Sequence, residues 1–594
     1  MRARFLNLRS SSWRSSTRSV AGVQRWKRWL EPALLTLLIQ GAACSEPVVD
    51  EPMPPMPYVP PPASTVVDAS PVRIRREVLH IDVPVPPPNP MAAQNGETPA
   101  AHNRVRVVRY RVDSDPPQPA RAIAVLMPGF LGGAGSFDPL ARALVRRSTP
   151  DAAIEAWAID RRANLLEDHH GLDVAEVRGD PELASSYYFG GSELEGRRFG
   201  GTLGQEQVAY MSEWGLATTL HDLRAVLDRI PQAQRKGHVV LIGHSLGASL
   251  AEEYAAWDFN GRPGYEDLAG LVLVDGTTGT EGSSTVPITK QQYLEGISGS
   301  FPRPGLNKIR RREPMYILPL LGSDVYLTAA ISSLRAAWRP MDVVSDPDRD
   351  RAMKVLLGLT QLPPMTNRAA LGFSFDRAYN ALSFAAVSCG AGTGGRIEPY
   401  QSVLGAELLH PTDVHATYDW IDFDKTQPLG HTALGDLARA WFHGPELDFA
   451  EWYFPARLAL DIPAAGSLVL NTSDWPRSEY ALRASHGRTL DLPILALASG
   501  LVGRGGGDVR AYDALRKLVD AVPIGPGRPQ QGLPRSKPEA FRVLAYPQLT
   551  HMDPLMGADS PLSQAQEWYR ELHGFLILHT TASQAPVVSP LPSP

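Results

Sequence analysis

Short runs of consecutive apolar residues recur along the chain, separated by segments in which apolar residues follow a helical period. Continuous apolar runs favour strands that are buried on both faces of a largely parallel sheet. A preceding segment, 72–85, alternates well enough to form a first strand. The other predicted strands are Arg104–Val112, Ala122–Met127, Glu155–Ile159, Val239–Ile242, Leu271–Val274, Ile494–Ala498 and Phe541–Ala545.

Helical patterns lie between several of these strands. Strands that alternate with helices predict an α/β fold, with a mostly parallel sheet and helices on both of its faces. The predicted helices are Asp138–Arg147, Glu213–Ile230, Leu246–Trp257, Val509–Val519 and a closing helix, Leu562–Ile577.

The interval between the sixth and seventh strands is too long for a loop and must be structured. Its apolar patterns at Tyr316–Ala337, Arg351–Leu359 and Arg368–Ala386 predict a large, mainly helical cap inserted over the C-terminal edge of the sheet. The apolar stretch 315–331 is interrupted by a proline, a glycine and an aspartate. It is therefore expected to be a buried cap helix rather than a membrane span.

The start of the chain has the features of an export signal. Residues 1–30 are rich in arginine and contain no acidic residue, the apolar run Ala33–Ile39 follows, and small residues then lead to Cys44. This order is typical of a secretion signal. Because the small residues end on a cysteine, the segment resembles a bacterial lipoprotein signal, although Gly41 stands where that family prefers a larger aliphatic residue. The alternative is an ordinary signal peptide cleaved near Ala43.

The lipoprotein resemblance implies that Cys44 is lipidated and becomes the mature N-terminus. The protein is then expected to be exported and anchored to a membrane, in the periplasm or at the cell surface, and otherwise to be secreted. The predicted organisation is a signal segment (1–44), a Pro-rich tether (45–101), the first part of the sheet domain (102–280), the cap (281–484), the second part of the sheet domain (485–580) and a disordered tail (581–594).

Composition narrows the possible partners and chemistry. The formal net charge of −5 and the pI near 6.3 do not favour a nucleic-acid partner. The two cysteines, Cys44 and Cys389, provide neither a disulfide scaffold nor a metal-binding pair. With Cys44 acylated, Cys389 is expected to be a buried small hydrophobic residue.

The strongest motif is Gly-His-Ser-Leu-Gly at residues 243–247, between a predicted strand and a predicted helix. Gly243 and Gly247 leave room for a strained turn that exposes the hydroxyl of Ser245. In this context the motif resembles the nucleophile elbow of the α/β-hydrolase superfamily, in its lipase and esterase form. The resemblance covers about residues 103–280 and 485–578, and it implies that Ser245 is the catalytic nucleophile.

A glycine-rich loop follows the predicted strand Ala122–Met127. The superfamily usually has His-Gly-x at this position; here Pro128 replaces the histidine and Gly129 is kept. The resemblance implies that the backbone N–H groups of Phe130 and Leu246 form an oxyanion hole.

The resemblance also places a catalytic base after the last strand, where His551 precedes the closing helix. His551 is expected to accept the Ser245 proton and later to protonate the leaving group. The acid has two candidates. Asp508 is the first carboxylate after the strand before last, but it is also a candidate N-cap. Asp275, slightly preferred, directly follows the sixth strand, where pancreatic-type lipases carry their acid.

These residues predict a serine hydrolase that cleaves carboxylic esters, small-molecule or lipid, through an acyl-enzyme intermediate and without a cofactor. The alternatives are an amidase, peptidase or acyltransferase on the same fold, or a surface lipoprotein that binds ligands without catalysis. No metal is expected, because the acidic and histidine clusters at 167–170 and 410–415 lack the spacing of a zinc enzyme; they are expected to be solvated loop residues. Asp160, Arg161 and Arg162 are expected at the top edge of the sheet, where they would shape the pocket or its entrance.

Overall fold

The structure is a computed structural model that describes residues 72–278, 286–298, 302–316, 324–402, 405–442, 444, 446–447, 449–470, 472–500 and 507–582. The predicted signal segment with Cys44, the start of the predicted tether and nearly all of the predicted tail lie outside the described residues. All described residues belong to one compact unit.

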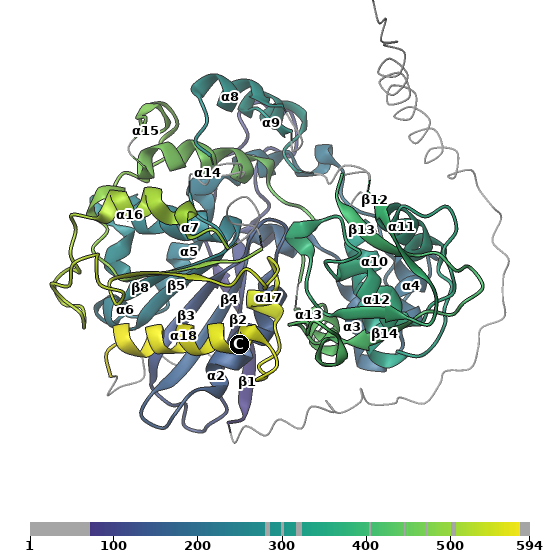
Figure 1. The fold of residues 1–594 in the computed structure, drawn as a ribbon. Helices are drawn as coiled ribbons and strands as arrows, with labels where there is room; N and C mark the ends of the chain where they lie inside the picture. The colour runs from purple at the N-terminus through teal and green to yellow at the C-terminus, as the bar shows by residue number, and fades with distance from the viewer. Residues whose placement is uncertain are drawn as a thin grey trace, which may run out of the picture. The chain divides into compact units, whose positions relative to one another are not determined.

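Eight strands form one sheet in the order β1-β2-β4-β3-β5-β8-β15-β16 (Figure 1). Only β2 runs antiparallel to its neighbours, and the other adjacent pairs are parallel. The predicted fold class, an α/β fold with a mostly parallel sheet, is confirmed. The strands are β1 (Ile74–Asp82), β2 (Arg104–Val112), β3 (Ala120–Met127), β4 (Ala153–Asp160), β5 (Val239–His244), β8 (Gly270–Val274), β15 (Ile494–Ala498) and β16 (Phe541–Ala545).

Helices cover both faces of the sheet. In Figure 1, α2 and α18 lie on one face, whereas α5 and α7 pack together on the other. The helix predicted at 509–519 begins with a 3-10 turn, and only its second half is α-helical. The helices of the sheet domain are α2 (Asp138–Arg146), α5 (Leu216–Leu227), α6 (Gln232–His238), α7 (Leu246–Ala256), α16 (Asp513–Val519), α17 (Asp553–Met556) and α18 (Gln564–His579), with a short hairpin of β6 (Asp258–Phe259) and β7 (Arg262–Pro263).

The predicted tether extends too far along the chain. The first strand pairs with β2 along its whole length, and the segment that follows is also held to the domain. The side-chain amide of Asn89 donates to the carbonyl oxygens of Ala209 and Arg310, at 2.9 Å each. Residues 74–101 therefore belong to the folded domain, because polar anchors and strand pairing offset the low apolar content of this proline-rich segment.

The insertion between β8 and β15 is mainly helical, as predicted. Its elements are α8 (Lys290–Glu295), β9 (Gly296–Ile297), β10 (Arg303–Pro304), α9 (Leu306–Arg312), α10 (Asp324–Trp338), α11 (Pro347–Leu357), α12 (Asn367–Phe375), β11 (Gly390–Thr393), β12 (Ile397–Gln401), β13 (Glu407–Pro411), β14 (Asp419–Asp422), α13 (Leu434–Ala440), α14 (Ala456–Val469) and α15 (Trp475–Tyr480).

The insertion differs from the predicted single cap in two respects. Its helix α14 packs on α5 and α7 of the sheet domain. In addition, α3 (His170–Arg178) and α4 (Pro181–Tyr188), which precede the insertion in sequence, pack against α10. Arg335 of α10 forms an ion pair with Glu182 of α4 at 2.7 Å. The domain boundaries at 280 and 484 therefore do not separate two independent bodies.

The helix predicted at 368–386 ends at Phe375 because the next residue binds the backbone. One carboxylate oxygen of Asp376 accepts the Ala378 N–H at 2.9 Å, and the other accepts the Cys389 N–H at 2.8 Å. Such side-chain bonds turn the chain out of a helix. They also bring Cys389 into the hydrophobic core, where it is a free thiol, as predicted. Burial raises the pKa of that thiol.

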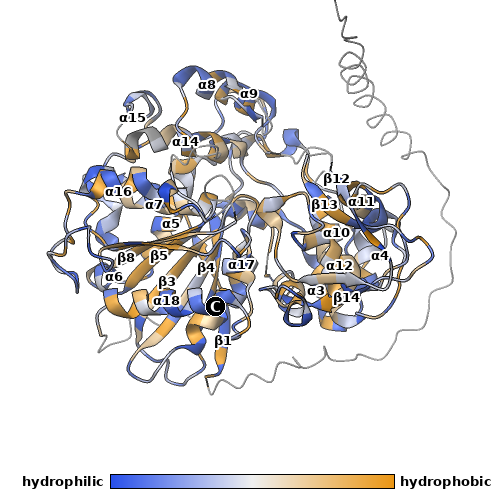
Figure 2. Ribbon diagram, viewed as in Figure 1, coloured by the Kyte–Doolittle hydropathy of each residue, from blue (hydrophilic) through white to orange (hydrophobic). Residues whose placement is uncertain are grey.

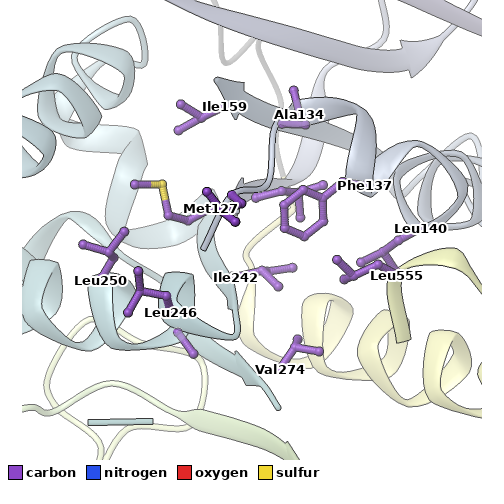
Figure 3. Close-up of a cluster of buried hydrophobic side chains, with 14 of the residues drawn as sticks. Met127, Ala134, Phe137, Leu140, Ile159, Ile242, Leu246, Leu250, Val274 and Leu555 are labelled. Carbon is purple, nitrogen blue, oxygen red and sulfur yellow. The ribbon is translucent and has the colours of Figure 1, made fainter. Parts of the chain in front are cut away.

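Apolar residues concentrate in the sheet and on the inward faces of the helices (Figure 2). Figure 3 shows part of this core below the carboxyl ends of the strands. Met127 and Ile242, from the ends of β3 and β5, pack close to Leu246 and Leu250 of α7. This packing makes the edge of the sheet a rigid base for the residues that follow each strand. Among the described helices, none is both long and apolar enough to cross a membrane.

Candidate active site

Ser245 lies at the turn between β5 and α7 with a strained backbone, at φ 56° and ψ −123°. A residue with a side chain keeps such a conformation only where its surroundings impose it. Two close approaches do so here: a Cβ at Gly243 would lie 2.1 Å from the Gly247 oxygen, and one at Gly247 would lie 2.2 Å from the Met127 oxygen. The Ser245 N–H also donates to the Val274 oxygen at 2.9 Å. The turn is thus fixed by both neighbouring strands.

The loop after β3 lies directly against Ser245. A Cβ at Gly129 would lie 2.8 Å from the Ser245 Cβ, so a larger residue does not fit without a shift. Among the described residues, neither the Phe130 N–H nor the Leu246 N–H donates to a backbone or side-chain acceptor. Both amides flank Ser245, one from this loop and one from the first turn of α7, whose N-terminus favours negative charge.

The ring of Phe130 is held in an aromatic cluster. Its centroid lies 4.7 Å from that of Phe454, 5.2 Å from Tyr316 and 6.3 Å from Phe384, all in edge-on geometry. Edge-to-face pairs at these distances are favourable beyond the area they bury. The three partners belong to the insertion, so the insertion fixes the position of Phe130.

His551 and Asp275 form a buried hydrogen-bonded pair. The distance between His551 Nδ1 and Asp275 Oδ2 is 2.6 Å, and the two residues are 2% and 1% exposed. The other carboxylate oxygen of Asp275 accepts the Ser499 N–H at 2.7 Å, and the Asp275 N–H donates to the Leu497 oxygen. Because Nδ1 faces the carboxylate, Nε2 of the imidazole is left to accept a proton.

The other candidate acid, Asp508, makes different contacts. Its carboxylate accepts the Arg510 N–H at 3.0 Å and pairs with the Arg510 guanidinium at 2.6 Å. The bond to Arg510 lowers the pKa of Asp508 to about 2. Asp508 is thus an N-cap at the surface, whereas Asp275 is the carboxylate next to His551.

No role was predicted for His244, although it lies within the Gly-His-Ser-Leu-Gly motif. Its Nε2–H donates to the carbonyl oxygen of His551 at 2.9 Å, and the two rings lie 4.4 Å apart. Burial, assisted by repulsion from His551, lowers the pKa of His244 to about 3. A neutral imidazole thus fixes the backbone of His551.

A second residue that sequence reasoning missed is Asp553, which is fully buried. One carboxylate oxygen accepts the Thr550 N–H at 2.8 Å, and the other accepts the Ser388 N–H at 3.0 Å and the Thr432 hydroxyl at 2.7 Å. The loop that carries His551 is therefore tied to two segments of the insertion. No local sequence signal distinguishes such an aspartate from a surface residue.

A cavity of about 160 Å³ lies above these groups and is lined by both Ser245 and His551. Its floor is the loop 129–132 with the elbow, and its walls come from the insertion, mainly α10, α11 and the segment 380–385. Most of the lining is apolar, with Val325, Met353 and Leu382 among its residues. The cavity is suited to an apolar group next to the serine hydroxyl.

The cluster at 167–170 is only partly exposed and is hydrogen-bonded within the protein, whereas solvated loop residues were predicted. The side chain of Glu167 is buried, and its carboxylate accepts the Trp452 N–H at 2.8 Å and pairs with His169 at 3.0 Å. Asp168 accepts the Tyr187 hydroxyl at 2.8 Å. These bonds join α3 and α4 to the insertion. No group of three or more His, Cys, Asp or Glu side chains arranged for a metal ion occurs in the described part of the chain.

No family model and no curated protein matches the chain by sequence. Solved structures that resemble it include a candidate lipase of Sulfolobus solfataricus (12% identity, 84% of this chain and 94% of the other covered, TM-score 0.38) and the peroxisomal α/β-hydrolase Lpx1 of Saccharomyces cerevisiae (9%, 88% and 93%, 0.36). The epoxide hydrolase VrEH1 of Vigna radiata is also similar (11%, 84% and 97%, 0.32). At such TM-scores these likenesses do not distinguish one reaction from another.

Proposed function

We propose that this protein is a serine hydrolase that cleaves carboxylic esters, with Ser245 as the nucleophile, His551 as the base and Asp275 as the acid. The observation that carries the proposal is the buried 2.6 Å pair of His551 and Asp275, whose imidazole lines the same cavity as Ser245. A serine at a strained turn beside a histidine that a carboxylate orients is the arrangement that activates a hydroxyl for attack.

In the proposed reaction, His551 Nε2 removes the Ser245 proton as Oγ attacks the ester carbonyl. The tetrahedral oxyanion accepts hydrogen bonds from the N–H groups of Phe130 and Leu246, and each such donor contributes on the order of 3 kcal/mol. Asp275 stabilises the charged imidazole, which then protonates the departing alkoxide. Water attacks the acyl-enzyme with His551 again as base, and the acid product leaves; no cofactor takes part.

The cavity suggests which acyl groups fit. An apolar cavity of about 150 Å³ accommodates a group of roughly the size of benzene, and the cavity here is of that size, about 160 Å³. The cavity is only partly enclosed, so its volume does not limit the length of the acyl chain, and we propose an ester with an apolar acyl group as the substrate.

Reaction with a fluorophosphonate probe tests the proposal. We expect the wild-type protein to be labelled at Ser245, and the Ser245→Ala variant to be unlabelled although it melts at the same temperature. Absence of labelling in the folded wild-type protein would instead indicate a ligand-binding protein without hydrolase activity.

A second measurement distinguishes the reactions available to this fold. The rates on p-nitrophenyl esters of increasing acyl length are compared with those on the matched anilides, with and without an added alcohol. Ester cleavage with water as acceptor supports the proposal. Faster anilide cleavage would indicate an amidase or peptidase, and transfer to the alcohol would indicate an acyltransferase.

We further propose that the protein is exported and anchored to a membrane through lipid on Cys44, with support only from the sequence of the first 44 residues. Expression in a bacterial host with a radioactive fatty acid checks this. We expect label in the wild-type protein and none in Cys44→Ala. An unlabelled, freely soluble wild-type protein would favour an ordinary signal peptide.

A further inference from the structure

Arg161, the first residue after β4, is surrounded by acceptors from the loop that carries Phe130. The residue is 4% exposed. Its Nη1 donates to the carbonyl oxygen of Pro128 at 2.9 Å, and its Nη2 donates to those of Gly129 at 2.9 Å and Gly132 at 3.1 Å. One guanidinium thus holds three carbonyl groups of a single loop.

The charge of Arg161 is matched by Glu451, a fully buried residue of the insertion. The Glu451 carboxylate accepts from Arg161 Nη2 at 2.6 Å and from Nε at 3.1 Å, which is a two-pronged arrangement that lysine cannot reproduce. The Phe454 ring lies under the same guanidinium, 5.4 Å from its carbon.

The backbone of this part of the insertion also pairs with the loop. The Glu451 N–H donates to the Leu131 oxygen at 3.0 Å, and the Gly133 N–H donates to the Phe449 oxygen at 2.8 Å. A β-bridge joins Gly132 to Ala450, which lies between Phe449 and Glu451 in the chain. The loop is therefore held between β4 on one side and residues 449–451 on the other.

Peptide geometry connects these bonds to the site. The Gly129 carbonyl and the Phe130 N–H belong to the same planar trans peptide, so they point in opposite directions. A bond that fixes the Gly129 oxygen on Arg161 therefore also fixes the direction of the Phe130 N–H. A donor aimed before the reaction begins stabilises the oxyanion without reorganisation.

We propose that Arg161 is a positioning residue that aims the Phe130 N–H at the reacting carbonyl, and that Glu451 holds Arg161 in place. The insertion then fixes the loop of the oxyanion hole through Glu451 and Arg161, in addition to forming the cavity wall. The catalytic part of this inference rests on the proposed function, whereas the effect on the loop does not.

The adjacent residue provides a matched control. Arg162 is also buried and pairs with Asp222 through two bonds, at 2.9 and 2.5 Å. It stacks on Trp214 with its guanidinium carbon 5.5 Å from the ring centroid. Its backbone acceptors are the Pro84 and His102 oxygens, outside the loop 128–133.

The experiment compares Arg161→Lys with Arg162→Lys, and Glu451→Gln with Asp222→Asn, in the full chain. The measurements are kcat and KM on a p-nitrophenyl ester, the rate of fluorophosphonate labelling, the melting temperature, and hydrogen exchange of the 129–133 amides. We expect Arg161→Lys and Glu451→Gln to lower kcat about 10- to 100-fold with little change in KM, since one oxyanion donor is misaimed. Labelling should slow in parallel, and the loop amides should exchange faster.

The control variants should lose similar thermal stability but keep kcat within about threefold, with unchanged exchange in the loop. Equal kcat losses in both pairs, or a loss confined to KM, would overturn the catalytic part of the proposal. If the wild-type protein neither hydrolyses esters nor reacts with the probe, the proposed function fails. Hydrogen exchange then still decides whether Arg161 holds the loop, and unchanged exchange in Arg161→Lys would overturn that part.

Discussion

The sheet domain and the insertion are both well packed and both contain buried ion pairs, but they differ in how their strands are arranged. In the sheet domain, eight strands pair through their backbones in one sheet, and glycines let segments approach closely at the elbow. In the insertion, strands occur as isolated pairs, and buried ion pairs such as Arg335–Asp346 at 2.8 Å join the helices. The sheet positions the residues that follow its strands, and side-chain pairs such as Arg161–Glu451 connect the insertion to that edge of the sheet.

The sheet domain and the insertion are therefore expected to have different roles in the site. The residues that we propose to react follow strands of the sheet, and the insertion forms the cavity walls and supports the loops. Substitutions of the residues that follow the strands should therefore mainly lower kcat, and those in the cavity wall should mainly change which substrate is preferred. Glu451 is the exception in the insertion, because it supports the loop that carries Phe130.

The largest expected effect is that of Asp275→Asn. An amide at this position would favour the wrong tautomer of His551 and would not stabilise its charge, so kcat should fall about 10⁴-fold. The measurement is kcat on a p-nitrophenyl ester, with Asp508→Asn as the control that keeps wild-type activity. The reverse order of effects would show that Asp508 is the acid.

A smaller loss is expected from Gly129→Ala. The new methyl group would meet the Ser245 Cβ at 2.8 Å, so it would push the loop from the serine and lower kcat about 10²- to 10³-fold. In Gly132→Ala the nearest atom is 3.5 Å away, so steady-state kinetics should show a much smaller loss. Equal activities of the two variants would argue against contact between the loop and the reacting groups.

In the insertion, Ala329→Phe should change specificity more than rate. Ala329 lies on α10 and lines the cavity, so a phenyl ring there would reduce the space for the acyl group. The kcat/KM for a hexanoyl ester should fall about tenfold relative to that for an acetyl ester. An equal loss of kcat/KM on both esters would show instead that α10 affects catalysis and not the binding of the acyl group.

An effect on stability rather than on activity is expected at Glu252 of α7. One of its oxygens accepts from the Thr277 hydroxyl and the Thr278 N–H, and burial raises its pKa to about 8. The folded protein thus retains a proton that the unfolded chain loses above the usual carboxyl pKa. Between the usual carboxyl pKa and about pH 8, this contribution to the stability of the folded protein declines by about 1.4 kcal/mol per pH unit.

Glu252→Gln removes this titration. We expect its melting temperature, relative to that of the wild type, to rise between pH 5 and pH 8. If the melting temperatures of the variant and the wild type change in parallel between pH 5 and pH 8, Glu252 is ionised in the folded protein. Its pKa is then not raised.

The sequence predicted the sheet domain closely, because local patterns determine it. Each buried strand was expected within two residues of its observed ends, since a continuous apolar run between turns has few other structures available. The insertion was predicted only as a helical region. Within the insertion, α14 packs on the sheet domain, whereas α10 packs against α4 and α12. This arrangement depends on contacts between residues far apart in the chain.

The same limit applies to the site. Ser245 and His551 carry local signals, a motif and a position after the last strand. The choice between Asp275 and Asp508 needed the fold, because parallel β8 and β15 bring the end of one strand next to the loop after the other. Glu451 had no signal at all, since it is separated from Arg161 by 290 residues.

The central claim is that Ser245 becomes acylated during turnover. The most direct measurement is to quench the Asp275→Asn variant with acid during reaction with a p-nitrophenyl ester and to map the acylated peptide by mass spectrometry. We expect one acyl group per chain, on Ser245, and none in a variant that also carries Ser245→Ala. An acyl group on another residue, or steady ester hydrolysis by the Ser245→Ala protein, would contradict it.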